Sequence, residues 1–192
     1  MPHNMYYRLG GLYAQQQIAF HGLMIVLVAA FALVFLVLLF LYERFSIAIS
    51  IILMPLIAMS AVFIGLWLTG IELNISSMMG MTMIVGIVTE VAIFYFSEYY
   101  EQLKKGVGKD EALAIAGTSR FRPIAMTTLA AILALLPLAL DIGQGSAMQQ
   151  PLAIAIISGL IVQMPLVLLV MPALFARITR NHDLPTEKKK KV

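Results

Sequence analysis

Five long runs of apolar residues, separated by short polar stretches, account for most of the chain. They lie at about residues 21–42, 47–68, 76–99, 123–140 and 151–175. A helix rises 1.5 Å per residue, so each run is long enough to cross all or nearly all of a hydrocarbon core about 30 Å thick. The pattern predicts an all-α membrane protein, with a bundle of five transmembrane helices within residues 21–180.

The polar stretches predict the remaining parts of the chain. Residues 1–20 are expected to form a periplasmic or interfacial lead-in, and residues 181–192 a basic cytoplasmic tail. The segment DEALAIAG predicts a short interfacial helix in the charged loop before the fourth run, acidic in its first turn and ending at Gly117. Pro123 fits the first turn of the fourth span, where its missing N–H is harmless.

The composition agrees with a membrane protein and excludes several other classes. Hydrophobic residues make up 61% of the chain and charged residues 12%, about half of what soluble domains carry. The absence of cysteine excludes disulfides and thiolate metal sites. No phosphate loop, nucleophile triad or metalloprotease helix is present, so neither an enzyme nor a nucleic-acid partner is expected.

A cluster of methionines at the start of the third run allows two interpretations. They could be soft-metal ligands or packing residues, and no histidine or cysteine accompanies them. We therefore favour packing, and expect no metal site and no cofactor. The residues concerned are Met78, Met79, Met81 and Met83.

The positive charges are strongly asymmetric about the predicted spans. If the loops alternate between the two sides, one side receives twelve of the thirteen lysines and arginines, and the other receives only Arg8. The positive-inside rule then predicts a periplasmic N-terminus and a cytoplasmic C-terminus in the inner membrane. An odd number of spans is consistent with this orientation.

One carboxylate, Glu90, interrupts the third apolar run. An ionised side chain at the bilayer centre costs about 2.5–3.5 kcal/mol, so a functional role is the default hypothesis. On a helix, one arc carries Glu90 together with most of the small and polar side chains, and this arc is expected to face inward. Its other members are Met79, Thr82, Gly86, Thr89, Ile93 and Ser97.

Two interpretations of Glu90 remain open at this point. The carboxyl group could bind and release a proton, or it could form a hydrogen bond that packs two helices, with Thr127 as its partner. Glu98 lies near the end of the same run and is expected to reach the solvated interface.

Two segments of the second half of the chain have distinctive sequences, SRFRPIAMTT at residues 119–128 and DIGQGSAMQQP at residues 141–151. Together with residues 86–98 and the turn at residues 41–46, they resemble the last five transmembrane helices of resistance-nodulation-division (RND) efflux permeases. The resemblance covers residues 12–180. It implies a homotrimeric inner-membrane antiporter that exchanges inward-flowing protons for exported substrate, assisted by a periplasmic adaptor and an outer-membrane channel.

The resemblance also implies roles for individual residues. By motif position, it places a proton relay at Glu90, Arg120 and Thr127, with supporting residues at Thr89, Arg122 and Gly86. The arginines could instead serve only the positive-inside signal, and Thr127 only a helix contact. The relay carboxylates of the fourth helix and the porter domains belong to an N-terminal part of the same permease, which we expect as a partner alongside the lipid bilayer.

Two questions stay open: which substrate is exported, and whether the chain is part of a longer permease or a protein of its own. A carboxylate at Glu90 resembles heavy-metal exporters, whereas the segment RPIAMTT resembles drug exporters, so both metal cations and hydrophobic or amphiphilic compounds remain candidates. The alternative function is a stand-alone membrane scaffold or accessory subunit without transport activity of its own.

Overall fold

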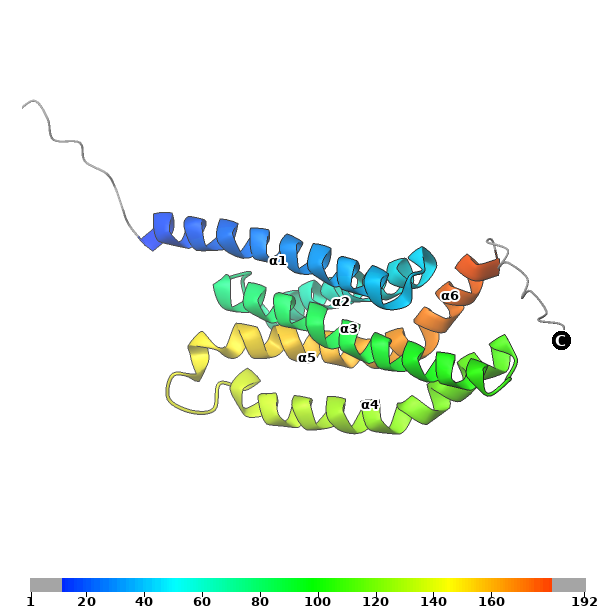
Figure 1. The fold of residues 1–192 in the computed structure, drawn as a ribbon. Helices are drawn as coiled ribbons and strands as arrows, with labels where there is room; N and C mark the ends of the chain where they lie inside the picture. Colours follow the sequence, from blue (N-terminus) through cyan, green and yellow to red (C-terminus); the bar gives the residue numbers. More distant parts are fainter. Residues whose placement is uncertain (1–11, 181–192) are drawn as a thin grey trace, which may run out of the picture.

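The computed structural model describes residues 12–180, with side chains over residues 15–177. The described part of the chain is helical and contains no strand, which confirms the predicted all-α fold (Figure 1). Five of its helical stretches are long and apolar enough to cross a membrane. The predicted tail at residues 181–192 and the first part of the predicted lead-in, residues 1–11, lie outside the described residues.

Four long helices correspond to the first four apolar runs. They are α1 (Leu12–Tyr42), α2 (Phe45–Thr69), α3 (Ile75–Lys104) and α4 (Lys109–Ala139). The first connection consists of Glu43, in a left-handed conformation with φ 50°, and Arg44. Asn74 caps α3, because its side chain accepts a hydrogen bond from the backbone N–H of Ser77 at 2.9 Å.

The fifth apolar run divides into three helical pieces. These are α5 (Gln150–Pro165), a π-helical turn η2 (Leu166–Val170) and α6 (Met171–Arg180). Pro172 lies two residues after the end of η2 and cannot donate the backbone hydrogen bond that a regular helix requires there. Figure 1 shows α6 leaving the line of α5 at this point, so the fifth span is interrupted near its end.

Two of the predicted boundaries differ from the observed helices. The helix predicted to end at Gly117 continues through that residue and through Pro123 as the bent helix α4 (Figure 1). The hydroxyl of Tyr95 donates to the carbonyl of Leu113 at 2.8 Å, which joins α3 to the first part of α4. The start of α1 at Leu12 likewise joins the predicted interfacial segment to the first span.

The core lies among α2, α3 and α5. Half of the residues in the apolar centre of each of these helices are buried, against 6% in α1 and 11% in α4. Gly80 and Gly159 allow α3 and α5 to approach closely. A Cβ atom added at Gly80 would lie 3.1 Å from the carbonyl oxygen of Leu152, and one at Gly159 would lie 2.5 Å from Cδ1 of Ile84.

Candidate functional site

A cavity of about 510 Å³ lies between α3, α4 and α5. All three residues predicted for the proton relay, Glu90, Arg120 and Thr127, line it. Most of the remaining wall is apolar, and Thr128 and Gln163 add two further polar side chains. The structure therefore brings together the residues that the resemblance selected from two helices.

Glu90 lies on the open side of α3. Its side chain is exposed, as are those of Met79 and Ser97 from the same arc, and Gly86 has open space where a Cβ atom would stand. Thr89 is the buried member of the arc. The expectation that this arc faces inward is therefore wrong for the five-helix bundle.

The physical reason is that the opposite stripe of α3 is more apolar. This stripe packs into the core against α2 and α5, where burial of apolar surface stabilises the bundle. Its residues include Ile84, Val88, Ala92 and Phe96, each with an exposed fraction of 0%.

Arg120 forms an ion pair with Glu98. The distance from Arg120 Nη2 to Glu98 Oε2 is 2.9 Å, and the two side chains are 31% and 14% exposed. Gln102 Nε2 donates to the other carboxylate oxygen, Oε1, at 2.8 Å. The prediction that Glu98 is solvated is therefore wrong. The next helix, α4, packs beside α3 and places Arg120 next to Glu98.

Thr127 uses its hydroxyl proton within its own helix. Its Oγ1 lies 3.1 Å from the carbonyl oxygens of both Pro123 and Ile124. A helix-packing hydrogen bond from Thr127 to Glu90 is thus not formed in this structure. The lone pairs of the hydroxyl remain available as acceptors on the cavity wall.

The supporting residues lie away from the cavity wall. Thr89 is buried and donates from Oγ1 to the carbonyl of Val85 at 2.6 Å. Arg122 and Gly86 are exposed, and neither lines the cavity. Thr127 and Ala134 of α4 are exposed as well.

Gln163 is a further residue of the site, which the sequence pattern did not single out. It lies on α5, has an exposed fraction of 1% and lines the same cavity as Glu90. The signal was present but weaker than for Glu90, because a glutamine within an apolar span is a polar group that needs a hydrogen-bond partner but carries no charge. The position of Gln163 opposite α3 and α4 followed only from the packing.

The methionines of α3 do not converge on one point. Met78 and Met81 are buried in the core, whereas Met79 and Met83 are exposed. Among the described residues, no three histidine, cysteine, aspartate or glutamate side chains form a group that could hold a metal ion. Burial in the core favours a packing role for Met78 and Met81.

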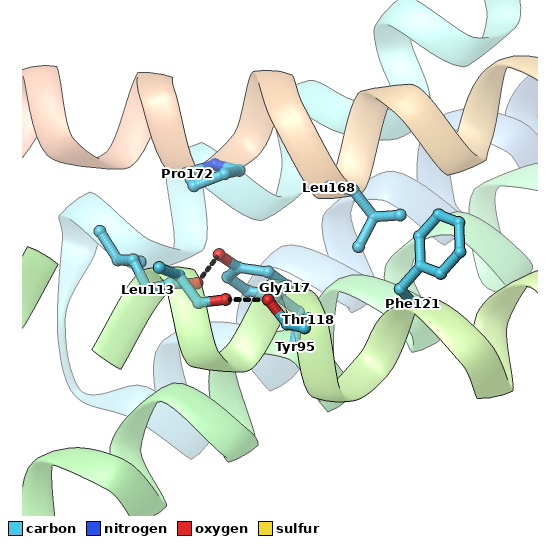
Figure 2. Close-up of a pocket in the computed structure, with 8 residues that line it drawn as sticks. Tyr95, Leu113, Gly117, Thr118, Phe121, Leu168 and Pro172 are labelled. Atoms are coloured by element: carbon cyan, nitrogen blue, oxygen red, sulfur yellow. Dashed lines mark hydrogen bonds between the residues drawn. The ribbon is translucent and has the colours of Figure 1, made fainter. Parts of the chain in front are cut away.

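A second cavity, of about 410 Å³, lies between the first half of α4 and the π-helical turn (Figure 2). Figure 2 shows Leu168 and Pro172 on one side and residues of α4 on the other. Its two hydroxyl groups are already paired, Tyr95 with the carbonyl of Leu113 and Thr118 with that of Ala114. This apolar space therefore lacks the chemistry of a proton site.

Comparison with known proteins places these features in a family. The family model of the AcrB/AcrD/AcrF family matches residues 1–179. The swarming motility protein SwrC of Bacillus subtilis (strain 168) is 36% identical over 149 residues, which are 76% of this chain and 14% of SwrC. The multidrug export protein AcrF of Escherichia coli (strain K12) is 32% identical over 151 residues, 78% of this chain and 14% of AcrF.

Solved structures agree with the sequence relatives. The crystal structure of a heavy metal efflux pump, in its crystal form II, matches with a TM-score of 0.79 and 30% identity over 93% of this chain and 18% of the pump. Crystal form I matches with a TM-score of 0.75 and 29% identity, over 88% of this chain and 17% of the pump. The chain thus spans a small part of the length of each of these proteins.

Proposed function

Because the chain belongs to the AcrB/AcrD/AcrF family of RND permeases, as its resemblance implied, we propose that it is the proton-coupling part of an efflux antiporter. The relay consists of Glu90, Arg120 and Thr127, and Glu98 holds the arginine. One observation carries the proposal: the two oppositely charged groups and the threonine, from two helices, line one cavity among the spans. Ionisable groups among membrane-spanning helices usually mark ion or proton pathways.

The ion pair between Arg120 and Glu98 suggests how the relay operates. When Glu90 is protonated and neutral, Arg120 rests against Glu98, as it does here at 2.9 Å. When Glu90 loses its proton, a second carboxylate on the same cavity competes for the guanidinium group. Proton binding and release at Glu90 then change the position of a charge on α4, which couples protonation to helix movement.

Membership of the family supports a proposal for the environment and the partners of the chain. The chain is a multi-pass membrane protein, and we place it in the cytoplasmic (inner) membrane with the loop at residues 141–149 on the periplasmic side. In the complete permease it works as a trimer with a periplasmic adaptor and an outer-membrane channel. A cysteine introduced at Gln144 should react with a membrane-impermeant maleimide from outside the cell, and one at Lys109 should not; the reverse pattern would contradict this orientation.

The names of the relatives point to two classes of substrate. AcrF is a multidrug export protein, and the solved structures are of a heavy metal efflux pump. We therefore include both amphiphilic compounds and metal cations as substrates of the complete permease. Export of ethidium and of copper, silver and zinc ions by the same vesicles decides between them.

The decisive experiment is Glu90→Gln in the complete permease that carries this chain. The amide cannot release a proton at physiological pH, so export driven by a pH gradient in reconstituted vesicles should be abolished while membrane insertion is retained. Glu101→Gln is the matched control, because Glu101 is exposed and pairs with Lys105 on the surface. Undiminished export by the Glu90→Gln variant would contradict the proposed relay.

A further inference from the structure

The side chain of Gln163 is buried without a hydrogen-bond partner for its carbonyl oxygen. The residue is 1% exposed, and its Oε1 atom has no partner among the described residues. A buried acceptor left unpaired destabilises a fold, whereas an apolar side chain of the same length would not. The rest of α5 facing this cavity is apolar, with Leu152, Ile156 and Leu160 on the wall.

A second unpaired polar atom lies on the same cavity. The Nε atom of Arg120 is buried and has no partner among the described residues, while Nη2 of the same guanidinium binds Glu98. Nε–H is a donor and Gln163 Oε1 an acceptor, so the two groups are chemically complementary. They come from different helices, α4 and α5, and both line the cavity that contains Glu90.

The wall of the cavity is mostly apolar, but its few polar groups provide hydrogen-bond partners that water can use and an apolar ligand cannot. A volume of about 510 Å³ accommodates several water molecules. A buried water molecule typically makes two to four hydrogen bonds, and Arg120, Gln163, Thr128 and Glu90 supply donors and acceptors for them.

We propose that this cavity holds water bound between Arg120 Nε and Gln163 Oε1, and that Gln163 is a positioning residue for the water that carries protons to and from Glu90. The proposal rests on the proposed function of Glu90. In each transfer, a water oxygen accepts the proton of the Glu90 carboxyl group and passes a different proton to the next water, so no water is consumed. Gln163 itself neither gains nor loses a proton.

The test replaces Gln163 with methionine in the complete permease. Methionine keeps the length of the side chain and removes the acceptor. If Gln163 binds functional water, the rate of export driven by a pH gradient should fall by about tenfold or more, and its pH profile should shift, while the thermal stability stays the same or rises. Gln163→Asn keeps an acceptor that water can reach and should recover part of the rate.

Gln150→Met is the matched control on the same helix. Gln150 lies outside the cavity, and its Nε2 donates to the carbonyl of Ala139 at 3.0 Å. This variant should lower thermal stability, and its export rate per folded molecule should match that of the wild type. Equal effects of the two substitutions on both stability and rate would assign Gln163 a merely structural role and overturn the proposal.

High-resolution maps of the permease provide the second measurement. Density for water between Arg120 and Gln163 in the wild type, lost in the Gln163→Met variant, supports the proposal. A side chain from another part of the permease, or an amphiphile, in contact with Gln163 Oε1 would overturn it. Retained coupled export by Glu90→Gln would contradict the proposed relay. Normal export by Gln163→Met, with Glu90→Gln inactive, would contradict only the role of Gln163.

Discussion

One face of α3 is buried in the bundle, and the other is exposed. One face carries Ile84, Val88 and Phe96 at 0% exposed fraction and packs against α2 and α5. The other carries Gly86 and Glu90 and remains open beside the cavity. The packed face of α3 stabilises the bundle, and the open face carries the residues proposed for proton transfer. Substitutions on the packed face should therefore lower stability, and substitutions on the open face should change transport.

The largest effect is expected from a bulky residue on the packed face. Gly80→Leu forces a side chain against Ala155 and the backbone of Leu152, where even a Cβ atom would lie within 2.8 Å of the Ala155 Cβ. Overpacking of this kind costs about 1–3 kcal/mol or more, and here the obstacle includes backbone. Thermal unfolding in detergent should show a large loss of stability.

Gly86→Leu provides the matched comparison on the open face. Nothing lies within 4 Å of a Cβ atom added there, so the variant should fold with nearly wild-type stability. The main effect of this variant should be on transport, because the leucine lies one helical turn before Glu90. Equal loss of stability in both glycine variants would contradict the separation of the two faces.

A smaller effect is expected from Glu98→Gln, which removes the charge that holds Arg120. The guanidinium keeps one neutral hydrogen-bond partner but loses its counter-ion, which we expect to cost about 1–3 kcal/mol. Thermal unfolding measures this loss, and export should decline by severalfold because Arg120 is no longer held beside the relay cavity. A variant with unchanged stability and export would show that the ion pair is incidental.

The smallest effect is expected at the exposed pair of Lys105 and Glu101, which are 2.9 Å apart. The hydrogen bond and charge of Glu101 raise the pKa of Lys105 above its ordinary value of 10.5. Because the folded pKa is raised, any stabilisation is present below pH 10.5 and is lost as the pH rises through the folded value.

Glu101→Gln should therefore lower the pKa of Lys105 toward 10.5, as measured by NMR titration of its Nζ group. Stability at pH 7 should hardly change, because exposed ion pairs contribute little. A marked loss of stability at neutral pH would contradict this and would indicate that the open end of α3 is more tightly packed than its exposure suggests.

Much of the site was predictable because its residues stand in motifs. Glu90 was conspicuous as a charge in an apolar run, and Arg120 and Thr127 followed from the resemblance of residues 119–128 to RND permeases. The structure adds that the three line one cavity.

Other parts of the site depended on contacts between residues distant in the sequence. Glu98 was expected in solvent because its position near a helix end allows it to reach water, but the turn after α3 returns Arg120 to its side, 22 residues later. Gln163 joins the same cavity from α5, across 73 residues from Glu90. Local patterns carry no information about such partners.

The sequence by itself determined the number and nature of the spans, because a stretch of some twenty apolar residues has a stable place only in a membrane or a core. It also determined that a carboxylate lies within the third span. Only the tertiary structure decided which face of that span is packed, that α4 continues through Pro123, and that Glu98 rather than Glu90 pairs with Arg120. These outcomes depend on which helices lie side by side, and that is decided by the summed packing of the bundle.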